Sequence, residues 1–260
     1  MRMTDLMRRD WDDRARRNAF HYIASWKKEW NSEAFLASGK DDYQTLVASV
    51  LERCGIPATG ECMLELGCGA GRMTANFASH YKRVLALDVS TEMLSRGANI
   101  HSTLENISWL PVAGDNLATV ESNSVDFVFS YLVLQHMPTE AIAINYVLEM
   151  IRVLRSGGAF LFQFNGSRAR NMNLRGRISW GLVDALWSVH LRALSRAAAS
   201  AFGFDPATSG KSWRGAAIDL ERVESAVDQG RGVIREILGE NTPMTWCCGI
   251  KSGDECERRS

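Results

Sequence analysis

A glycine-rich turn offers the clearest chemistry in this sequence. Residues 64–72 read LELGCGAGR, and the glycines of this segment are Gly67, Gly69 and Gly71. Glycine adopts positive φ without strain and lets the backbone approach a ligand closely. A helix that begins directly after such a turn also offers free N–H groups. We therefore expect a strand, a ligand-holding turn and then a helix that starts near Arg72.

Two carboxylates constrain the ligand. Glu65 lies two residues before Gly67, and Asp88 follows Gly69 by about 20 residues, where a doubly wound sheet places the acid that binds ribose hydroxyls. A nicotinamide dinucleotide is the alternative ligand, but its pyrophosphate favours the spacing G-x-G-x-x-G. Here the third glycine comes one residue early, and Glu65 opposes a pyrophosphate but suits a cationic amino-acid group. These charges favour S-adenosylmethionine (SAM).

Apolar runs alternate with amphipathic runs through the middle of the chain. Residues 139–154 carry one apolar stripe at helical spacing, and Ser90 is placed to cap a helix over residues 91–98. Such alternation predicts βαβ units and a parallel sheet covered on both faces. The expected strands, short and mostly apolar, are at residues 63–66, 84–88, 108–113, 124–131 and 158–164, followed by a helix at 218–229 and strands at 232–238 and 244–250.

Five segments in this frame resemble a known family. ELGCGAGR resembles motif I of the class I SAM-dependent methyltransferases, and LALDVSTEML at 85–94 is similar to their second-strand motif. GDN at 114–116 resembles the third motif, and residues 124–138 resemble the fourth-strand motif. VLRSGGAFLFQF at 153–164 is similar to the entry to the fifth strand, with Ser156 where proline is common. The resemblance covers roughly residues 61–164.

The resemblance implies a fold and a set of cofactor contacts. The fold is a Rossmann-like, doubly wound α/β sheet of seven strands that ends in an antiparallel hairpin. Asp88 is expected on the ribose, Val89 and Met93 near the adenine, and Asp115 on the adenine amine, although Asp115 and Asn116 also suit a plain turn. The full set of cofactor-binding residues that the resemblance implies is Glu65, Gly67, Gly69, Gly71, Asp88, Val89, Met93, Asp115, Asn116 and Ser130.

The implied reaction is in-line transfer of the SAM methyl group to an O or N nucleophile of a small molecule, with S-adenosylhomocysteine (SAH) as product. His136 follows the fourth strand and is the candidate general base, although a histidine there also occurs in the family without a catalytic role. Two other functions remain open. One is a SAM-binding partner subunit without transfer activity, and the other is a nicotinamide-dependent oxidoreductase.

The rest of the chain reads as additions to one domain. Residues 1–50 suggest a helical flap that contains Trp11, Tyr22 and Trp26, residues 165–215 a helical cap after the fifth strand, and residues 216–260 the last helix and strands. The cap segment holds eight basic and two acidic residues, which suggests an anionic substrate if the segment is not simply a solvated face. The basic residues considered for this role are Arg175, Arg177 and Arg214, and the stretch SWRG at 212–215 reads as a pocket or hinge element.

Composition excludes several other classes of protein. The chain has 260 residues, 46% of them apolar, and a formal net charge of zero, so a nucleic-acid binder with a bulk cationic field is disfavoured. No secretory signal or membrane span is apparent, which favours a cytoplasmic protein without a membrane partner. The spacing of the six cysteines fits no zinc site, so no metal is expected.

Overall fold

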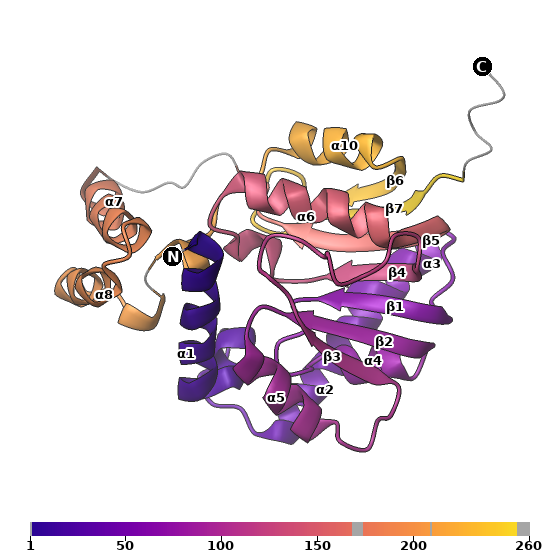
Figure 1. The fold of residues 1–260 in the computed structure, drawn as a ribbon, viewed down its shortest axis with the longest axis horizontal. Coiled ribbons are helices and arrows are strands. Elements are labelled where there is room, and N and C mark those ends of the chain that lie inside the picture. The colour runs from indigo at the N-terminus through magenta and orange to yellow at the C-terminus, as the bar shows by residue number, and fades with distance from the viewer. Residues whose placement is uncertain (1, 168–173, 209, 254–260) are drawn as a thin grey trace.

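One seven-stranded sheet forms the centre of the molecule (Figure 1). The computed structural model describes residues 2–167, 174–208 and 210–253. The strand order is β3-β2-β1-β4-β5-β7-β6; β1 to β5 run parallel, and β7 pairs antiparallel with both β5 and β6. This topology confirms the expected fold. The strands are β1 (Gly60–Leu66), β2 (Tyr81–Asp88), β3 (Ile107–Pro111), β4 (Val125–Ser130), β5 (Leu154–Phe164), β6 (Gly232–Leu238) and β7 (Thr245–Lys251).

Helices cover both faces of the sheet. Helices α6 (Glu140–Val153) and α10 (Leu220–Gln229) pack their apolar side chains on one face, against inward residues such as Leu64 and Phe160. On the opposite face, α3 (Ser49–Arg53), α4 (Thr74–Ala78) and the π-helical turn η1 (Tyr43–Ala48) pack against residues such as Phe127. Burial on both faces explains why the central strands are continuous apolar runs rather than alternating ones.

The helix cap expected at Ser90 is present, and Thr139 forms a second one. The Ser90 hydroxyl accepts a hydrogen bond from the Met93 amide at 3.2 Å and starts α5 (Thr91–Ile100). Thr139 does the same for α6 by accepting from the Ile142 amide at 3.3 Å. Each cap satisfies one of the amide groups that a helix N-terminus leaves without an internal partner.

The helix after the glycine turn starts later than the sequence suggested. α4 begins at Thr74 and has five residues, whereas we expected a start near Arg72. Gly67, Gly69 and Gly71 all have positive φ, which is incompatible with a right-handed helix. The turn therefore persists through Gly71, and the helix forms only after it.

Helix α1 of the predicted N-terminal addition lies beside the predicted cap, on one flank of the sheet (Figure 1). The N-terminal region contains α1 (Met3–Ile23) and α2 (Ser32–Asp42). The segment after β5 contains α7 (Leu174–Ser188), α8 (Arg192–Ala201), the 3-10 turn η3 (Pro206–Thr208) and α9 (Lys211–Arg214). In Figure 1, α7 and α8 lie beyond α1, away from the strands. We call α1 the flap and α7 to α9 the cap.

A buried charge cluster joins the flap to the cap. Asp10 of α1 is 4% exposed and accepts hydrogen bonds from the Trp187 indole at 2.6 Å and the Ser212 hydroxyl at 2.7 Å. The Arg192 guanidinium binds Asp10 at 2.8 Å through Nε and Asp13 at 2.9 Å, and Arg196 binds Asp13 at 2.8 Å. Two basic residues of the cap, Arg192 and Arg196, thus pair with acids on the flap that lie 179 to 183 positions earlier in the sequence.

No helix among the described residues is both long and apolar enough to cross a bilayer. The longest of them, α1, has 21 residues but carries several charged side chains along its length.

Candidate functional site

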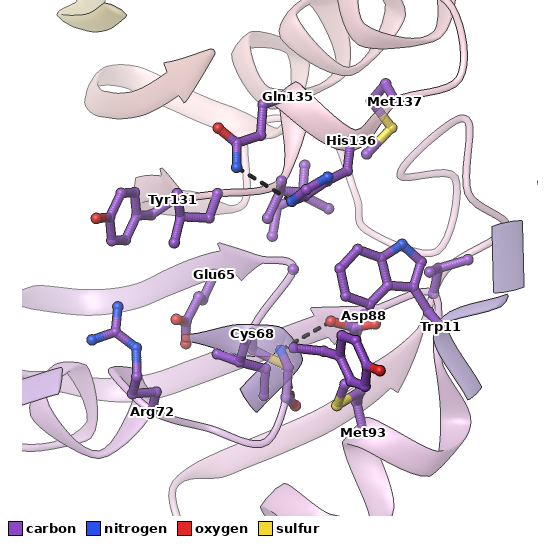
Figure 2. A pocket seen from close by; sticks show the side chains of 18 of the residues that line it. Trp11, Glu65, Cys68, Arg72, Asp88, Met93, Tyr131, Gln135, His136 and Met137 are labelled. Atoms are coloured by element: carbon purple, nitrogen blue, oxygen red, sulfur yellow. Dashed lines mark hydrogen bonds between the residues drawn. The ribbon is translucent and has the colours of Figure 1, made fainter. Parts of the chain in front are cut away.

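A cavity of about 500 Å³ opens at the carboxyl ends of the parallel strands (Figure 2), and side chains of α1 and α9 form part of its lining. In a doubly wound sheet this edge, where the strand order reverses, is the usual ligand site. Figure 2 shows Glu65 and Arg72 at one end of the cavity, Asp88 and Trp11 at the other, and His136 across from Asp88. Seven of the residues predicted from sequence line it: Glu65, Gly67, Gly69, Asp88, Val89, Met93 and His136.

The glycine turn forms the floor of the cavity. The amide of Gly67 donates to the Leu87 carbonyl at 2.6 Å, which fastens the turn to β2. Gly67 and Gly69 have φ values of 75° and 56°. A Cβ on Gly67 would lie 2.1 Å from Val133, and one on Gly69 would lie 2.8 Å from Ile23. The missing side chains therefore let the flap and the loop after β4 approach the turn closely.

Asp88 is fixed by backbone amides on both sides. Its Oδ2 accepts from the Gly69 amide at 2.9 Å and its Oδ1 from the Ser90 amide at 2.8 Å. Burial raises its pKa to about 6, although these hydrogen bonds favour the ionised form. The second lone pairs of both oxygens remain for a ligand, as a pair of ribose hydroxyls requires.

Glu65 is a second buried carboxylate on the cavity. Its Oε2 accepts a hydrogen bond from the Thr74 hydroxyl at 2.5 Å, and burial raises its pKa to about 7. Within the described parts of the chain, neither Glu65 nor Asp88 forms an ion pair within 4 Å. Two desolvated carboxylates on one cavity favour a ligand that brings hydroxyl groups and positive charge, and they oppose a pyrophosphate.

Two predicted residues occupy supporting positions instead. Gly71 does not line the cavity; its carbonyl accepts from His101 Nε2 at 2.9 Å, and a Cβ there would lie 2.8 Å from Trp109. Ser130 also lies outside the lining, fully buried, and its hydroxyl donates to the Leu66 carbonyl at 3.2 Å. Gly71 thus admits an aromatic side chain behind the turn, and Ser130 ties β4 to β1.

Asp115 and Asn116 likewise lie outside the cavity lining. The Asn116 amide donates to Asp115 Oδ1 at 2.7 Å, and Asn116 Oδ1 accepts from the Ala118 amide at 3.0 Å. Asn145 of α6 binds the Asp115 carbonyl at 2.6 Å. These contacts are turn chemistry, the alternative that the sequence left open. Val112, three residues earlier, is the residue of this loop that lines the cavity.

His136 is held between two polar partners. Its Nδ1 donates to the carbonyl of Trp213, and its Nε2 accepts from the Gln135 amide at 3.2 Å. Burial lowers its pKa to about 4, so the ring is neutral at physiological pH. Because the Trp213 carbonyl fixes the proton on Nδ1, Nε2 is the acceptor atom. Gly215 permits this contact, since a Cβ there would lie 1.7 Å from the Gln135 carbonyl oxygen.

Gln163 supports this arrangement from β5. It is fully buried, and its amide nitrogen donates to Gln135 Oε1 at 3.2 Å and to the Pro243 carbonyl at 2.7 Å. Its Oε1 accepts from the Leu132 amide at 3.1 Å. Leu132 lines the cavity with φ of 58°, a conformation that costs a non-glycine residue about 1–2 kcal/mol. Sequence reasoning missed Gln163, which no motif singles out.

Aromatic rings close the cavity on the flap and cap side. Trp11, Tyr22 and Trp213 all line it with His136, and we call these four residues the aromatic wall. The ring of His136 lies 5.3 Å from Trp11 and 5.1 Å from Trp213, and Trp213 lies 5.8 Å edge-on to Tyr22. Trp26, which follows α1, lines the cavity too, so all three aromatic residues expected from the N-terminal region reach it.

Arg72 was expected only as a helix start, yet it lines the cavity. Its guanidinium pairs with Asp42 at 2.7 Å and lies over the rings of Trp26 at 5.2 Å and Tyr131 at 5.9 Å. A cation that directly follows a glycine turn was the available signal for this residue. For Tyr131 the only signal was its position at the end of the fourth strand.

Among the described residues, no cluster of three or more His, Cys, Asp or Glu side chains suits a metal ion.

Sequence comparison places the central part of the chain in a known group. Residues 64–162 match the family described as "Methyltransferase domain". The chain is 31% identical over 106 residues to a phosphoethanolamine N-methyltransferase of Triticum aestivum, a match that covers 40% of this chain and 21% of the relative. It is 26% identical over 164 residues to a ubiquinone biosynthesis O-methyltransferase of Paraburkholderia xenovorans, covering 62% and 59%. The chain thus spans about a fifth of the wheat protein and somewhat over half of the bacterial one.

Solved structures share the fold. Magnesium protoporphyrin IX methyltransferase from Synechocystis superposes with a TM-score of 0.58 at 12% identity, covering 96% of this chain and all of that one. Phosphoethanolamine N-methyltransferase 1 from Haemonchus contortus gives 0.51 at 19% identity over 64% of this chain and 33% of that one. Residues 64–162 thus match a methyltransferase domain, and these solved structures share the fold of the chain.

Proposed function

We propose that this protein binds SAM and transfers its methyl group to an oxygen or nitrogen atom of a small molecule. The observation that carries the proposal is the pair of desolvated carboxylates, Glu65 and Asp88, on the cavity beside the glycine turn. An ammonium group and a sulfonium group suit this charge pattern, whereas the pyrophosphate of a nicotinamide dinucleotide does not. The residues present therefore fit SAM.

The residues have distinct roles in this proposal. Asp88 binds the ribose hydroxyls, Glu65 and the turn at Gly67 face the amino-acid group, and Val89 and Met93 form the apolar surface for the adenine. SAM supplies an electrophilic methyl group that leaves behind a neutral thioether. The protein then has to align the acceptor and exclude water, and alignment alone lowers such barriers by about 7–11 kcal/mol.

His136 is the proposed acceptor of the proton that the nucleophile loses. Its Nε2 faces the cavity as a hydrogen-bond acceptor, and Gln135 now occupies that position. A pKa of about 4 makes full proton transfer before attack unfavourable. His136 therefore orients the nucleophile in the ground state and takes its proton as the new bond to carbon forms.

An anionic acceptor, suggested by the basic cap segment, gains little support. Arg192, Arg196 and Arg214 do not line the cavity, and they pair with carboxylates: the first two with Asp10 and Asp13, and Arg214 with Asp184 at 2.6 Å. The side chains of Arg175 and Arg177 lie outside the described residues.

We further propose that residues 1–260 form one domain, with the flap and the cap closing over the SAM-binding core.

Calorimetric titration with SAM, SAH, NAD⁺ and NADP⁺ tests the cofactor assignment. We expect SAM and SAH to bind and the dinucleotides not to bind; tight dinucleotide binding with no SAM binding would overturn the cofactor assignment.

His136→Ala is then expected to lower kcat at least tenfold while the Kd for SAM changes less than twofold. SAM binding without turnover over a broad acceptor panel would instead favour the alternative, a non-catalytic SAM-binding subunit.

A further inference from the structure

The aromatic wall differs in charge from the rest of the cavity. Among the described lining residues the charged side chains are Glu65, Arg72 and Asp88, which lie near the end of β1, directly after the glycine turn and at the end of β2. The wall, in contrast, consists of Trp11, Tyr22, Trp213 and the neutral ring of His136. A ligand group on this side therefore meets flat π surfaces and no formal charge in the lining.

Aromatic walls of this kind suit two kinds of ligand. A cationic ammonium group is attracted to the negative faces of aromatic rings, and a planar ring stacks on them or meets their edges. The two ligands make opposite demands on the charge behind the rings. A cation requires electron-rich faces with no competing positive charge, whereas an electron-rich ring gains from positive charge nearby.

Arg14 supplies positive charge behind the wall. It is 2% exposed, does not line the cavity, and its guanidinium carbon lies 4.8 Å from the centre of the Trp11 ring and 5.3 Å from that of Trp213. Neutral oxygens hold it in place: the Ala207 carbonyl at 2.9 Å and the Ser212 hydroxyl at 3.3 Å. Burial lowers its pKa to about 10, which still leaves it protonated at neutral pH.

The neighbouring acids do not cancel this charge. Asp10, the nearest acid, already binds Arg192 and accepts from Trp187 and Ser212. Asp10 and Asp13 are shared among the guanidiniums of Arg16, Arg192 and Arg196, and among the described residues no carboxylate forms an ion pair with Arg14 within 4 Å. A second cation placed on the cavity side of Trp11 and Trp213 would be repelled by Arg14, because a buried site screens charge poorly.

His136 adds a polar requirement at the edge of the wall. Its Nε2 accepts a hydrogen bond, since Nδ1 carries the proton and donates to the Trp213 carbonyl. The natural partner for a neutral imidazole acceptor is a hydroxyl group. A flat ligand against Trp213 therefore places a hydroxyl toward His136 most favourably, in the position that the Gln135 amide now occupies.

We infer that the methyl acceptor is a planar, electron-rich aromatic molecule bearing a hydroxyl group, which packs against Trp11, Tyr22 and Trp213 with its hydroxyl on His136. The inference rests on the proposed function and gives it a substrate class. The hydroxyl oxygen bonds to the methyl carbon, the carbon–sulfur bond breaks with its electron pair going to sulfur, and the proton passes to His136 and then to solvent. The positive charge of Arg14 favours this reaction because it stabilises negative charge that develops on the oxygen.

Two matched probes test the charge preference on the SAH-bound protein. These are 2-naphthol and (2-naphthyl)trimethylammonium, titrated by calorimetry, with choline as a cation that lacks a ring. We expect 2-naphthol to bind at least tenfold more tightly than the naphthyl cation and choline not to bind. Equal or tighter binding of either cation overturns the inference. Failure of SAH to bind in the same experiment points instead to failure of the proposed function.

Variants of the wall test where the ring binds. Trp213→Leu is expected to weaken 2-naphthol binding about tenfold, and Trp213→Phe to restore most of it, with SAH binding changed less than twofold in both. Trp180→Leu is the matched control, because Trp180 stacks on Phe204 at 4.0 Å within the cap and does not line the cavity. Equal loss in Trp180→Leu and Trp213→Leu would contradict direct stacking on Trp213.

Arg14→Met tests the source of the preference. The substitution keeps a long apolar side chain but removes the charge, so the preference for naphthol over the naphthyl cation is expected to shrink at least fivefold. A protein that still binds SAH but keeps the wild-type preference refutes the role of Arg14. If the variant does not fold, as judged by SAH binding, the two-probe comparison on the wild-type protein still decides the substrate class.

Discussion

The two sides of the cavity are assembled in different ways. The cofactor side comes from one stretch of fewer than 30 residues, from Glu65 to Met93, that forms β1, the glycine turn, β2 and the start of α5. The aromatic wall comes from three segments far apart in the chain, at Trp11 and Tyr22, at His136 and at Trp213. The first is a local motif that the sheet holds rigidly. The second exists only when the flap, the cap and the loop after β4 meet.

The largest loss of acceptor binding is expected from breaking the buried charge cluster that joins the flap to the cap. Asp10→Asn removes a buried charge that binds Arg192, Trp187 and Ser212, and such losses cost about 3–5 kcal/mol. We expect the cap to become cleavable by limited proteolysis and naphthol binding to be lost. SAH affinity and the far-UV signal of the sheet are expected to change little. A uniform loss of the whole fold would show that the two sides are not separable.

Asp88→Ala is expected to damage only the cofactor side. The change removes two charge-assisted hydrogen bonds to the ribose. The binding free energy of SAH should therefore weaken by about 2–3 kcal/mol, which raises its Kd roughly 30- to 150-fold. Asp88→Asn should give a smaller increase because it keeps an acceptor. Isothermal titration measures both. A wild-type Kd in Asp88→Ala would remove Asp88 from the cofactor site.

Glu65 predicts a pH dependence of cofactor binding. Its pKa in the free protein is about 7, and a bound ammonium group favours its ionised form, so binding releases a proton at lower pH. Affinity for SAH should therefore be nearly full at pH 7.5 and weaken about tenfold between pH 7.5 and 6, a window in which the α-ammonium group of the ligand stays mostly protonated. Glu65→Gln should flatten this slope. An unchanged slope in the variant would assign the titration to another group.

The smallest effect is expected at an exposed contact of the same flap. Arg16 of α1 pairs with Glu92 of α5 at 2.9 Å, and its side chain is 55% exposed. Exposed pairs contribute about 0–1 kcal/mol, so Arg16→Ala should lower Tm by no more than a few degrees and leave the cap resistant to proteolysis. This variant is the control for Asp10→Asn. Equal proteolysis in both would show that exposure does not set the strength of the flap contacts.

The same comparison explains what the sequence could and could not predict. Strand positions and the glycine turn followed from local patterns, because short apolar runs and helix caps depend on neighbouring residues. The seven-stranded sheet with its terminal hairpin followed from the family resemblance. The contact between His136 and the Trp213 carbonyl joins residues 77 positions apart, and no local pattern encodes it. Asp115 matched a motif by position, but it forms a turn and lies outside the cavity lining, so its contact with the adenine stays a prediction.

Charge gave a partial signal for the cap. The excess of basic residues at 165–215 was visible, and it suggested an anionic substrate. The acids that meet Arg192 and Arg196 are Asp10 and Asp13, more than 175 positions earlier, so their pairing depends on the folded arrangement. Some of the opposite charges that balance in the net charge of the chain therefore pair directly between the flap and the cap.

The distance along the chain between Asp10 and its partners also has a consequence for synthesis. Helix α1 leaves the ribosome before the other described elements, and Trp187 and Ser212 follow its Asp10 by 177 and 202 positions. At about 5–20 residues per second, α1 waits roughly 10–40 s before the surfaces that bury Asp10 exist. During this interval the central strands and the glycine turn are already available to fold. A nascent chain therefore gains a cofactor-binding core well before it gains a closed acceptor site, and bound SAM would stabilise that intermediate before the cap arrives.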